Sequence, residues 1–564
     1  MDRKTVLALI IIGIIFVGWI YLTQPEPRPQ PVETPVETDT LGVREATGDE
    51  AQTFEEQVDT AVAEGFEPIG GDSLYAAFDT LRVDTVQVET DKYIALFSSR
   101  GAGLVSFKFK NYNYNNGDTT MVEMVPPWAE AALKFQFPDA RDSFYFNRIV
   151  FMPEKNNIRL SGGNKDKLTF TANLANQGSI MVEYEFYADR YDFSVRLDFQ
   201  NASAFDLGRY YYFGWEPGLE STEKNRQDDF NSFKAYVMWD TGLEGYSKFQ
   251  NGQMSQEIEG NLQWVATKTK YFFVGIAPDR APQGVRIQGR EISVNEKAGQ
   301  PGMKKIGVQA EMEIHQRKSD LFDKYLIYVG PIDYKVLRSY NRGFEETVDL
   351  GWPIIKTISR FILWLMEVLY GIFHNYGVVI IIFSILMKVV FYPLTSRSLR
   401  SMKKMQELQP KLKALQEKYK KEPQKMQAEI MKLWKENKVN PMSGCLLMLP
   451  QLPIFFALFT VFRNTILLRG SEFMLWMKDL SQPDQTMILP LIMAGTMFLQ
   501  QKMTMQDPKQ KMLVYILPIV FFFLFKGFPT GLVLYWTMFN VLSVLETLLI
   551  RKPQQQKELA LKTE

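Results

Sequence analysis

Lys388 is the residue whose type and position point most strongly to function. It lies eleven residues into the apolar run 377–392, which holds no other charge, and five residues before Pro393. A charge at the centre of a bilayer costs about 2.5–3.5 kcal/mol on insertion scales. Two interpretations remain open: a lone cation in a water-filled cavity, or a lysine whose long stem snorkels to the membrane surface.

Further polar side chains occur in three of the apolar runs. In the last run Asn540, Ser543 and Thr547 recur at helical spacing, so a helix would bring them to one face. Taken singly, each is explained by hydrogen bonds between helices, worth about 0.6 kcal/mol per contact. Together with one unpaired cation, they favour a shared aqueous groove. The residues predicted to line this groove are Lys388, Ser384, Gln451, Asn540 and Thr547.

Catalytic and metal chemistry have few residues to work with. The chain has one cysteine, Cys445, and two histidines, His315 and His374. One cysteine excludes a disulfide within the chain and a thiolate cluster. Two histidines leave very few residues from which a histidine metal site or a Ser–His–Asp triad could be built. No phosphate-binding Gly-rich loop is visible. We therefore expect no catalytic residues, no cofactor and no metal, and the zero net charge indicates no nucleic-acid specificity.

The start of the chain predicts a membrane anchor. Residues 5–22 are uncharged and follow Arg3 and Lys4, and they suffice for about 27 Å of helix. A cleaved signal peptide is the alternative, but the run lacks a small-x-small cleavage site. We interpret residues 1–23 as an anchor. Residues 24–72 carry thirteen acidic and two basic residues, which predicts a disordered acidic linker.

Residues 73–341 show a different pattern, in which apolar and polar residues alternate. An example is the series Tyr191, Phe193, Val195, Leu197 and Phe199. Alternation of this kind is typical of strands with one wet face and one buried face. We therefore expect an antiparallel β-sandwich.

Charge predicts which of the later apolar runs cross a membrane. Residues 397–438 hold thirteen Lys or Arg against five Glu, and the positive-inside rule places them in the cytoplasm. The anchor runs outward and places the sandwich outside, so only one of the runs 354–373 and 377–392 crosses. The charged run 354–373 is predicted to lie along the outer interface as an amphipathic helix. The expected membrane core has six spans, with both termini cytoplasmic.

The basic segment is itself expected to fold. Apolar residues recur at helical spacing after Pro410 and Pro423, and each proline sits where a helix could begin. Two helices forming a cytoplasmic hairpin are predicted, and a solvated charged coil is the alternative. The expected organisation is an interfacial helix (349–375), a second span (376–395), the hairpin (396–439), spans three to six (440–550) and a short cytoplasmic tail (551–564).

Several motifs in the membrane half resemble one family. They are YPLT (392–395), NP (440–441), GC (444–445), QLPIFFAL (451–458) and FPTGLVLYW (528–536), which Asn540 follows. These segments are similar to the YidC family of membrane protein insertases, of the Gram-negative type with a large periplasmic domain. The resemblance is strong over residues 351–550, whereas the β region matches only in placement and β character.

The resemblance implies a bacterial inner-membrane protein and chaperone that inserts nascent membrane proteins, alone or with the Sec translocon. It implies a five-span core around a hydrophilic groove, contact with membrane lipids and, given the short tail, weak ribosome binding. The family usually places an arginine in the groove, and Lys388 stands at that position here. Lysine keeps the charge but lacks the planar fork, so we expect it to attract acidic client tails as a point charge. The predicted client-contact path consists of Leu452, Pro453, Phe455, Tyr535 and Trp536.

Two alternatives come from other classes of protein. A secondary transporter would need paired intramembrane charges and internal repeats, whereas one central charge and no repeat are visible. A membrane-anchored periplasmic protein that binds or modifies carbohydrate would need paired carboxylates or histidines in the sandwich. The sandwich has many carboxylates, so the sequence does not exclude ligand binding there.

Overall fold

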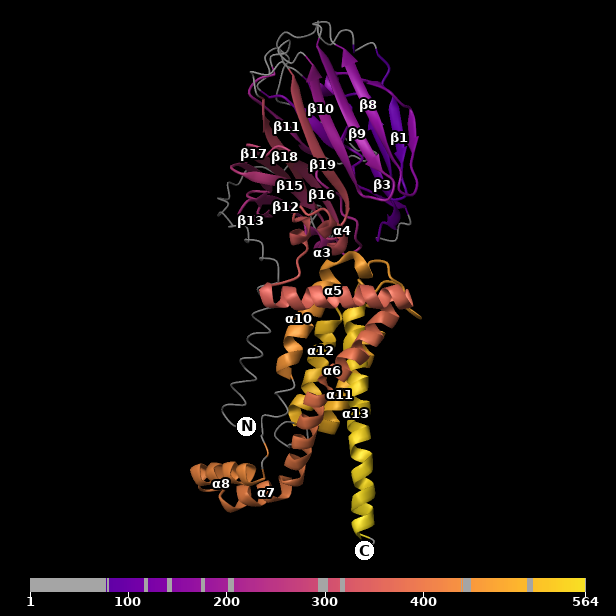
Figure 1. Cartoon of the computed structure of the whole chain (residues 1–564). Coiled ribbons are helices and arrows are strands. Elements are labelled where there is room, and N and C mark those ends of the chain that lie inside the picture. Colours follow the sequence, from indigo (N-terminus) through magenta and orange to yellow (C-terminus); the bar gives the residue numbers. More distant parts are fainter. Residues whose placement is uncertain are drawn as a thin grey trace, which may run out of the picture.

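The computed structural model of the chain describes residues 78, 81–115, 120–138, 145–173, 178–200, 207–292, 303–314, 320–437, 439, 448–504 and 511–562. The predicted anchor (1–23) and acidic linker (24–72) lie outside these residues. A β-rich part occupies one end of the molecule, and a set of long helices occupies the other (Figure 1). The predicted combination of a β-rich domain and a helical C-terminal region is therefore confirmed.

Three sheets form the β-rich part. The first has the order β4 (Met121–Glu123), β3 (Leu104–Asn113), β2 (Tyr93–Ser98), β1 (Thr85–Glu89) and β7 (Asn157–Arg159). The second has the order β13 (Gly242–Tyr246), β12 (Lys234–Trp239), β15 (Leu262–Lys268), β16 (Phe272–Pro278), β19 (Leu321–Pro331), β10 (Asp192–Gln200), β9 (Ser179–Tyr187), β8 (Lys165–Asn173) and β6 (Met152–Pro153). The third has the order β14 (Gln253–Glu259), β17 (Gly284–Ile292), β18 (Met303–Glu313), β11 (Tyr210–Trp215) and β5 (Leu133–Gln136).

The nine-stranded sheet forms one layer, and the two five-stranded sheets pack against it. Along β9 and β10 every second residue is buried, as the alternation predicts. Phe97 of the first sheet contacts Tyr184 of the large sheet with ring centroids 4.6 Å apart. Phe213 of the third sheet contacts Tyr325 of the large sheet at 4.4 Å. Among the described strands the pairing is antiparallel apart from β1 with β7.

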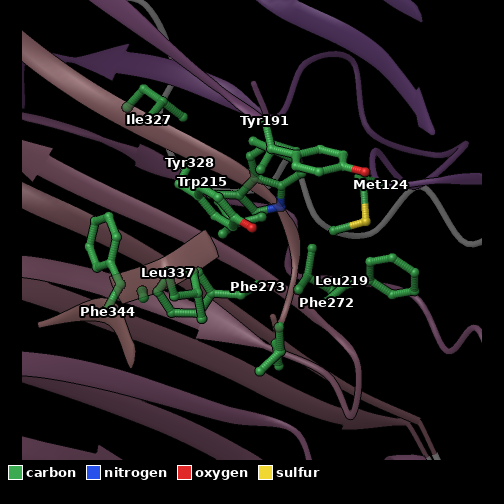
Figure 2. Packing of buried hydrophobic residues seen from close by; sticks show 14 of the residues in the cluster. Met124, Tyr191, Trp215, Leu219, Phe272, Phe273, Ile327, Tyr328, Leu337 and Phe344 are labelled. Carbon is green, nitrogen blue, oxygen red and sulfur yellow. The ribbon is translucent and has the colours of Figure 1, made fainter. Parts of the chain in front are cut away.

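Aromatic side chains pack closely in the core of the sandwich, and Figure 2 shows Phe273, Tyr328 and Phe344 among them. Trp264 is fully buried, and its indole N–H donates to the Arg342 carbonyl at 2.7 Å. Phe344 packs edge-on against Trp264 and Phe273. The chain therefore leaves the sandwich through a segment that is fixed by side-chain packing.

The helices follow in chain order. Four short ones belong to the β-rich part: η1 (Phe146–Arg148), α3 (Arg226–Phe230), α4 (Tyr334–Ser339) and η4 (Phe344–Thr347). The others are α5 (Pro353–Phe373), α6 (Tyr376–Glu407), α7 (Gln409–Lys418), α8 (Pro423–Glu436), α10 (Met448–Asn464), η5 (Ile466–Leu468), α11 (Ile488–Thr504), α12 (Lys511–Phe525) and α13 (Thr530–Lys562).

Helix α5 lies across the ends of the other long helices, directly beneath the sandwich (Figure 1). Its inner face packs on α10, where the buried Ser359 hydroxyl lies 3.1 Å from that of Thr460. A second face carries exposed apolar side chains, among them Ile354, Phe361 and Trp364. On a third face Lys356 and Arg360 both pair with Glu346 of η4. One apolar outer face and one charged face suit a helix at a membrane surface.

The turn between α5 and α6 follows from two polar residues. His374 ends α5 in the left-handed conformation, with φ 50°. Asn375 accepts the Val378 N–H through its side chain and so caps the first turn of α6. The two helices can therefore diverge sharply within two residues.

Helix α6 is longer than the sequence indicates. The predicted second span ends at residue 395 after Pro393, whereas α6 continues through Pro393 to Glu407. Proline lacks the N–H that would bond the carbonyl four residues back, so α6 passes through this turn with one backbone hydrogen bond fewer. Helices α7 and α8 have Pro410 and Pro423 at their first turns, as predicted.

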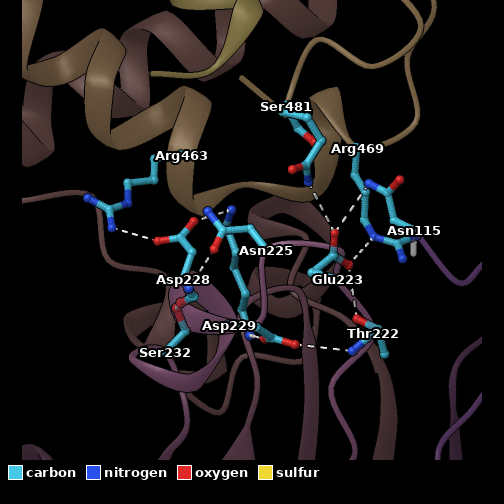
Figure 3. Close-up of polar contacts among 12 residues, drawn as sticks. Asn115, Thr222, Glu223, Asn225, Asp228, Asp229, Ser232, Arg463, Arg469 and Ser481 are labelled. Carbon is cyan, nitrogen blue, oxygen red and sulfur yellow. Dashed lines mark hydrogen bonds and ion pairs between the residues drawn. The ribbon is translucent and has the colours of Figure 1, made fainter. Parts of the chain in front are cut away.

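Ion pairs fasten the sandwich to the end of α10 and to the segment that follows it (Figure 3). The Arg469 Nε donates to Glu223 Oε1 at 2.7 Å, and the two side chains are 4% and 1% exposed. Arg463 pairs with Asp228 of α3 at 2.6 Å, and Lys270 pairs with the same carboxylate at 2.7 Å. We call these residues the junction cluster. Because its members come from both parts, the two parts cannot separate without breaking these ion pairs.

We expect Arg469→Ala to loosen this junction, because it leaves the buried Glu223 without its cation, at a cost of about 3–5 kcal/mol. Hydrogen exchange of the purified protein should become faster at residues 219–230 and 471–485. The matched control is Lys224→Ala, an exposed neighbour with one 3.3 Å contact to Gln485. Unchanged exchange in Arg469→Ala would show that the cluster does not hold the two parts together.

Lys268 is expected to make the stability of the sandwich depend on pH. It is buried and donates to the Thr347 carbonyl at 3.1 Å. Burial lowers the pKa of Lys268 to about 8, although Asp349 acts in the opposite direction. Between pH 8 and the unfolded value of 10.5, the folded state binds fewer protons than the unfolded state, so stability rises with pH over that window.

We therefore expect Lys268→Met to stabilise the sandwich at pH 7 by up to about 3 kcal/mol, because the mutant buries no charge. The difference from the unmodified protein should vanish near pH 10.5. Urea unfolding followed by tryptophan fluorescence measures it, with Lys324→Met on the exposed side of β19 as the control. A difference that stays constant with pH contradicts the explanation.

Candidate functional site

Helices α6 and α13 pack side by side and bring two charged residues together. The Lys388 Nζ lies 2.7 Å from Glu546 Oε2, and the two side chains are 12% and 8% exposed. Lys388 is the one charged residue of the stretch 376–395, and Glu546 is the one charged residue of 530–549. The expectation of a lone cation is therefore wrong: Lys388 belongs to a buried ion pair.

Three further side chains complete this pair. The Lys388 Nζ also donates to Ser543 Oγ at 2.8 Å and lies 4.8 Å from the centre of the Phe539 ring. On the other side, the Thr395 hydroxyl donates to Glu546 Oε1 at 3.0 Å. Each charged group thus has both an opposite charge and a polar neighbour, which is what a charge held away from water requires.

Glu546 was missed in the sequence, although a signal was present. It follows Ser543 by three residues and therefore lies on the polar face already identified for the last run. A single acid in one apolar run and a single base in another would have suggested a pair. Because Lys388 is paired with Glu546, a lack of paired intramembrane charges no longer argues against a secondary transporter.

The other predicted groove residues lie in different surroundings. Ser384 is fully buried and donates to the Ile380 carbonyl of its own helix at 2.7 Å, and Thr547 similarly donates to the Ser543 carbonyl at 2.8 Å. Asn540 is 3% exposed, and within the described part of the chain its amide nitrogen has no hydrogen-bond partner. Gln451 is half-buried in the first turn of α10. Ser384, Gln451, Asn540 and Thr547 therefore stay predictions as groove-lining residues.

The predicted client-contact residues divide between two sides of α13. Phe455 of α10 packs edge-on against Trp536, with ring centroids 5.3 Å apart, and both rings contact Phe525 of α12. Tyr535 is buried and instead contacts Phe383 of α6 at 5.9 Å. Leu452 and Pro453 are half-buried near the start of α10. Phe455 and Trp536 therefore form one aromatic cluster, and Tyr535 does not belong to it.

The outward surface of these helices is apolar. Two helical stretches are long and apolar enough to cross a membrane, Tyr376–Met402 and Thr530–Leu549, and Val514–Phe525 is a shorter apolar helix. Only 28% of the most apolar 18-residue stretch within Tyr376–Met402 is buried, whereas a core helix of a water-soluble protein would be mostly buried. Val389 and Val390 are each about two-thirds exposed. Exposed apolar surface of this extent suits contact with lipid.

Metal binding receives no support in the described part of the chain. Among these residues no group of three His, Cys, Asp or Glu side chains could hold a metal ion. His315 and Cys445 lie outside the described residues.

Comparison with known proteins adds independent information. The family model described as 60Kd inner membrane protein matches residues 368–558, and the one described as YidC periplasmic domain matches residues 85–365. The membrane protein insertase YidC of Chloroherpeton thalassium is 30% identical, and the match covers 100% of this chain and 98% of that protein. The protein of the same name from Pelobacter propionicus is 32% identical, with 98% and 99% covered. A crystal structure of an active YidC insertase with its first transmembrane domain resolved is 18% identical, covers 83% of this chain and 95% of that chain, and gives a TM-score of 0.36.

Proposed function

Because the chain belongs to the YidC family of membrane protein insertases, we propose that it inserts nascent membrane proteins by admitting their short polar segments to the polar site between α6 and α13. The observation that carries this proposal is the ion pair of Lys388 and Glu546, with Ser543 and Thr395 beside it. Its relatives are named as insertases, not as enzymes or transporters.

The physical task is to move a polar segment through hydrocarbon. Each charged or polar group that enters lipid unaccompanied costs several kcal/mol, on the order of 2.5–3.5 for a charge at the centre. Polar side chains on α6 and α13 shorten the stretch of hydrocarbon that the client's polar segment must cross. The client's apolar helix then leaves past Phe455 and Trp536 into lipid, and burial of apolar surface favours its release. No nucleotide or cofactor is required.

The proposed topology follows from charge and length. We propose that α6, α10, α11, α12 and α13 span the bacterial inner membrane together with the N-terminal anchor. Helix α5 lies at the periplasmic surface below the sandwich, and α7 and α8 form the cytoplasmic hairpin. The excess of Lys and Arg over Glu in residues 397–438 supports this orientation, with both termini in the cytoplasm.

The proposed partners follow from the same role. Nascent membrane proteins are the clients, and lipid surrounds the exposed apolar faces. The Sec translocon is a partner for clients with large translocated segments. The last 14 residues, 551–564, carry four basic and two acidic side chains, so ribosome contact through this tail is weak.

Insertion by the purified protein tests the function. In Sec-free proteoliposomes, we expect a single-span client with a short uncharged polar tail to acquire a protease-protected tail. Replacing the ion pair by Lys388→Leu with Glu546→Leu should lower the rate about tenfold or more, since apolar residues keep the helices packed but remove the polar site. Val389→Leu with Leu545→Val, on exposed faces of the same helices, is the matched control. Equal insertion into protein-free liposomes would overturn the proposal.

Cysteine labelling tests the topology. Cys445 is the only cysteine, so Cys445→Ser provides a background without thiols. In intact spheroplasts, an impermeant maleimide should label Lys324→Cys in the sandwich and should label Lys413→Cys in α7 only after lysis. Labelling of Lys413→Cys from outside would reverse the proposed orientation.

A further inference from the structure

Three neighbouring side chains surround the ammonium group of Lys388 in the described part of the chain. An ammonium has three N–H donors. One points to Glu546 Oε2 at 2.7 Å and one to Ser543 Oγ at 2.8 Å. The third side of the group lies over the Phe539 ring, whose centre is 4.8 Å away. The face of a benzene ring is electron-rich and attracts a cation, so this contact uses the remaining side of the charge.

Both carboxylate oxygens of Glu546 also have partners. Its Oε2 accepts from Lys388, and its Oε1 accepts from Thr395 at 3.0 Å. The side chain is 8% exposed. Because Lys388 and Glu546 are the only charged residues of the stretches 376–395 and 530–549, the two charges cancel within the site.

A client carboxylate would therefore have to displace Glu546 in order to reach Lys388. That exchange makes one ion pair and breaks another, and it leaves a buried carboxylate without a cation. A neutral amide or hydroxyl carries no such cost. A neutral donor also lies nearby: the buried amide nitrogen of Asn540, one helical turn before Ser543, has no partner among the residues that the structure describes.

We propose that Glu546 determines the client specificity of this insertase: by neutralising Lys388 it makes the site indifferent to the sign of charge on the client's tail. This inference rests on the proposed function. It replaces the expectation that Lys388 attracts acidic tails as a free point charge. The substrate class that the site admits is the short polar tail as such, whether neutral, weakly acidic or weakly basic.

The experiment measures insertion of three clients that differ only in the tail. One tail is uncharged, one carries two Asp and one carries two Lys. Proteoliposomes are used without a membrane potential, because a potential would itself act on the tail charge. The acidic-to-basic ratio of insertion, with the neutral tail as internal standard, should lie within about twofold of one for the unmodified protein, and Glu546→Gln should raise it about tenfold.

Two further variants complete the test. Lys388→Gln should shift the ratio in the opposite direction, so it decides the question if Glu546→Gln is not recovered folded. The exchanged pair, Lys388→Glu with Glu546→Lys, restores neutrality and should bring the ratio back near one. The inference is overturned if the unmodified protein already favours acidic tails, or if neither single substitution moves the ratio while the neutral client is inserted. Failure of the unmodified protein to insert even the neutral client would instead count against the proposed function.

Discussion

A charge that is held away from water must have its partner held with it, and two sites in this chain meet that requirement. Lys388 and Glu546 meet between two helices whose outer faces suit lipid. Arg469 and Glu223 meet where the sandwich contacts the segment after α10. In both cases the partners come from distant parts of the sequence, so each pair fixes one element against another. Breaking such a pair is expensive even when the intact pair contributes little net stability.

Features that depend on neighbouring residues were predictable from the sequence. Alternation predicted the strands, and prolines predicted where α7 and α8 begin. The partner of Lys388 was not found, because helical spacing says which residues share a face but not which helix that face meets. The predicted span 376–395 stops two residues after Pro393, whereas the helix itself continues to Glu407, because one proline removes a single backbone hydrogen bond from a long helix. Assignment to the family came from longer motifs, which hold many residues in fixed order.

The predicted client-contact path shows the limit of motif-based assignment. Tyr535 and Trp536 are adjacent in the motif, yet successive residues of a helix point about 100° apart. Trp536 therefore joins the aromatic rings of α10 and α12, whereas Tyr535 packs against α6. Both residues stay predictions as client contacts, but they lie on different sides of α13.

The junction cluster also has a mechanical consequence. Arg463 belongs to α10 and its partner Asp228 to α3 of the sandwich, so this ion pair couples a tilt of α10 to the sandwich. The sandwich extends away from the helices on the side opposite α7 and α8 (Figure 1). A small rotation of α10 would therefore produce a larger displacement at the strand ends that lie far from the helices. A fluorescent reporter at those strand ends would therefore record a motion of α10 at a distance from the helices.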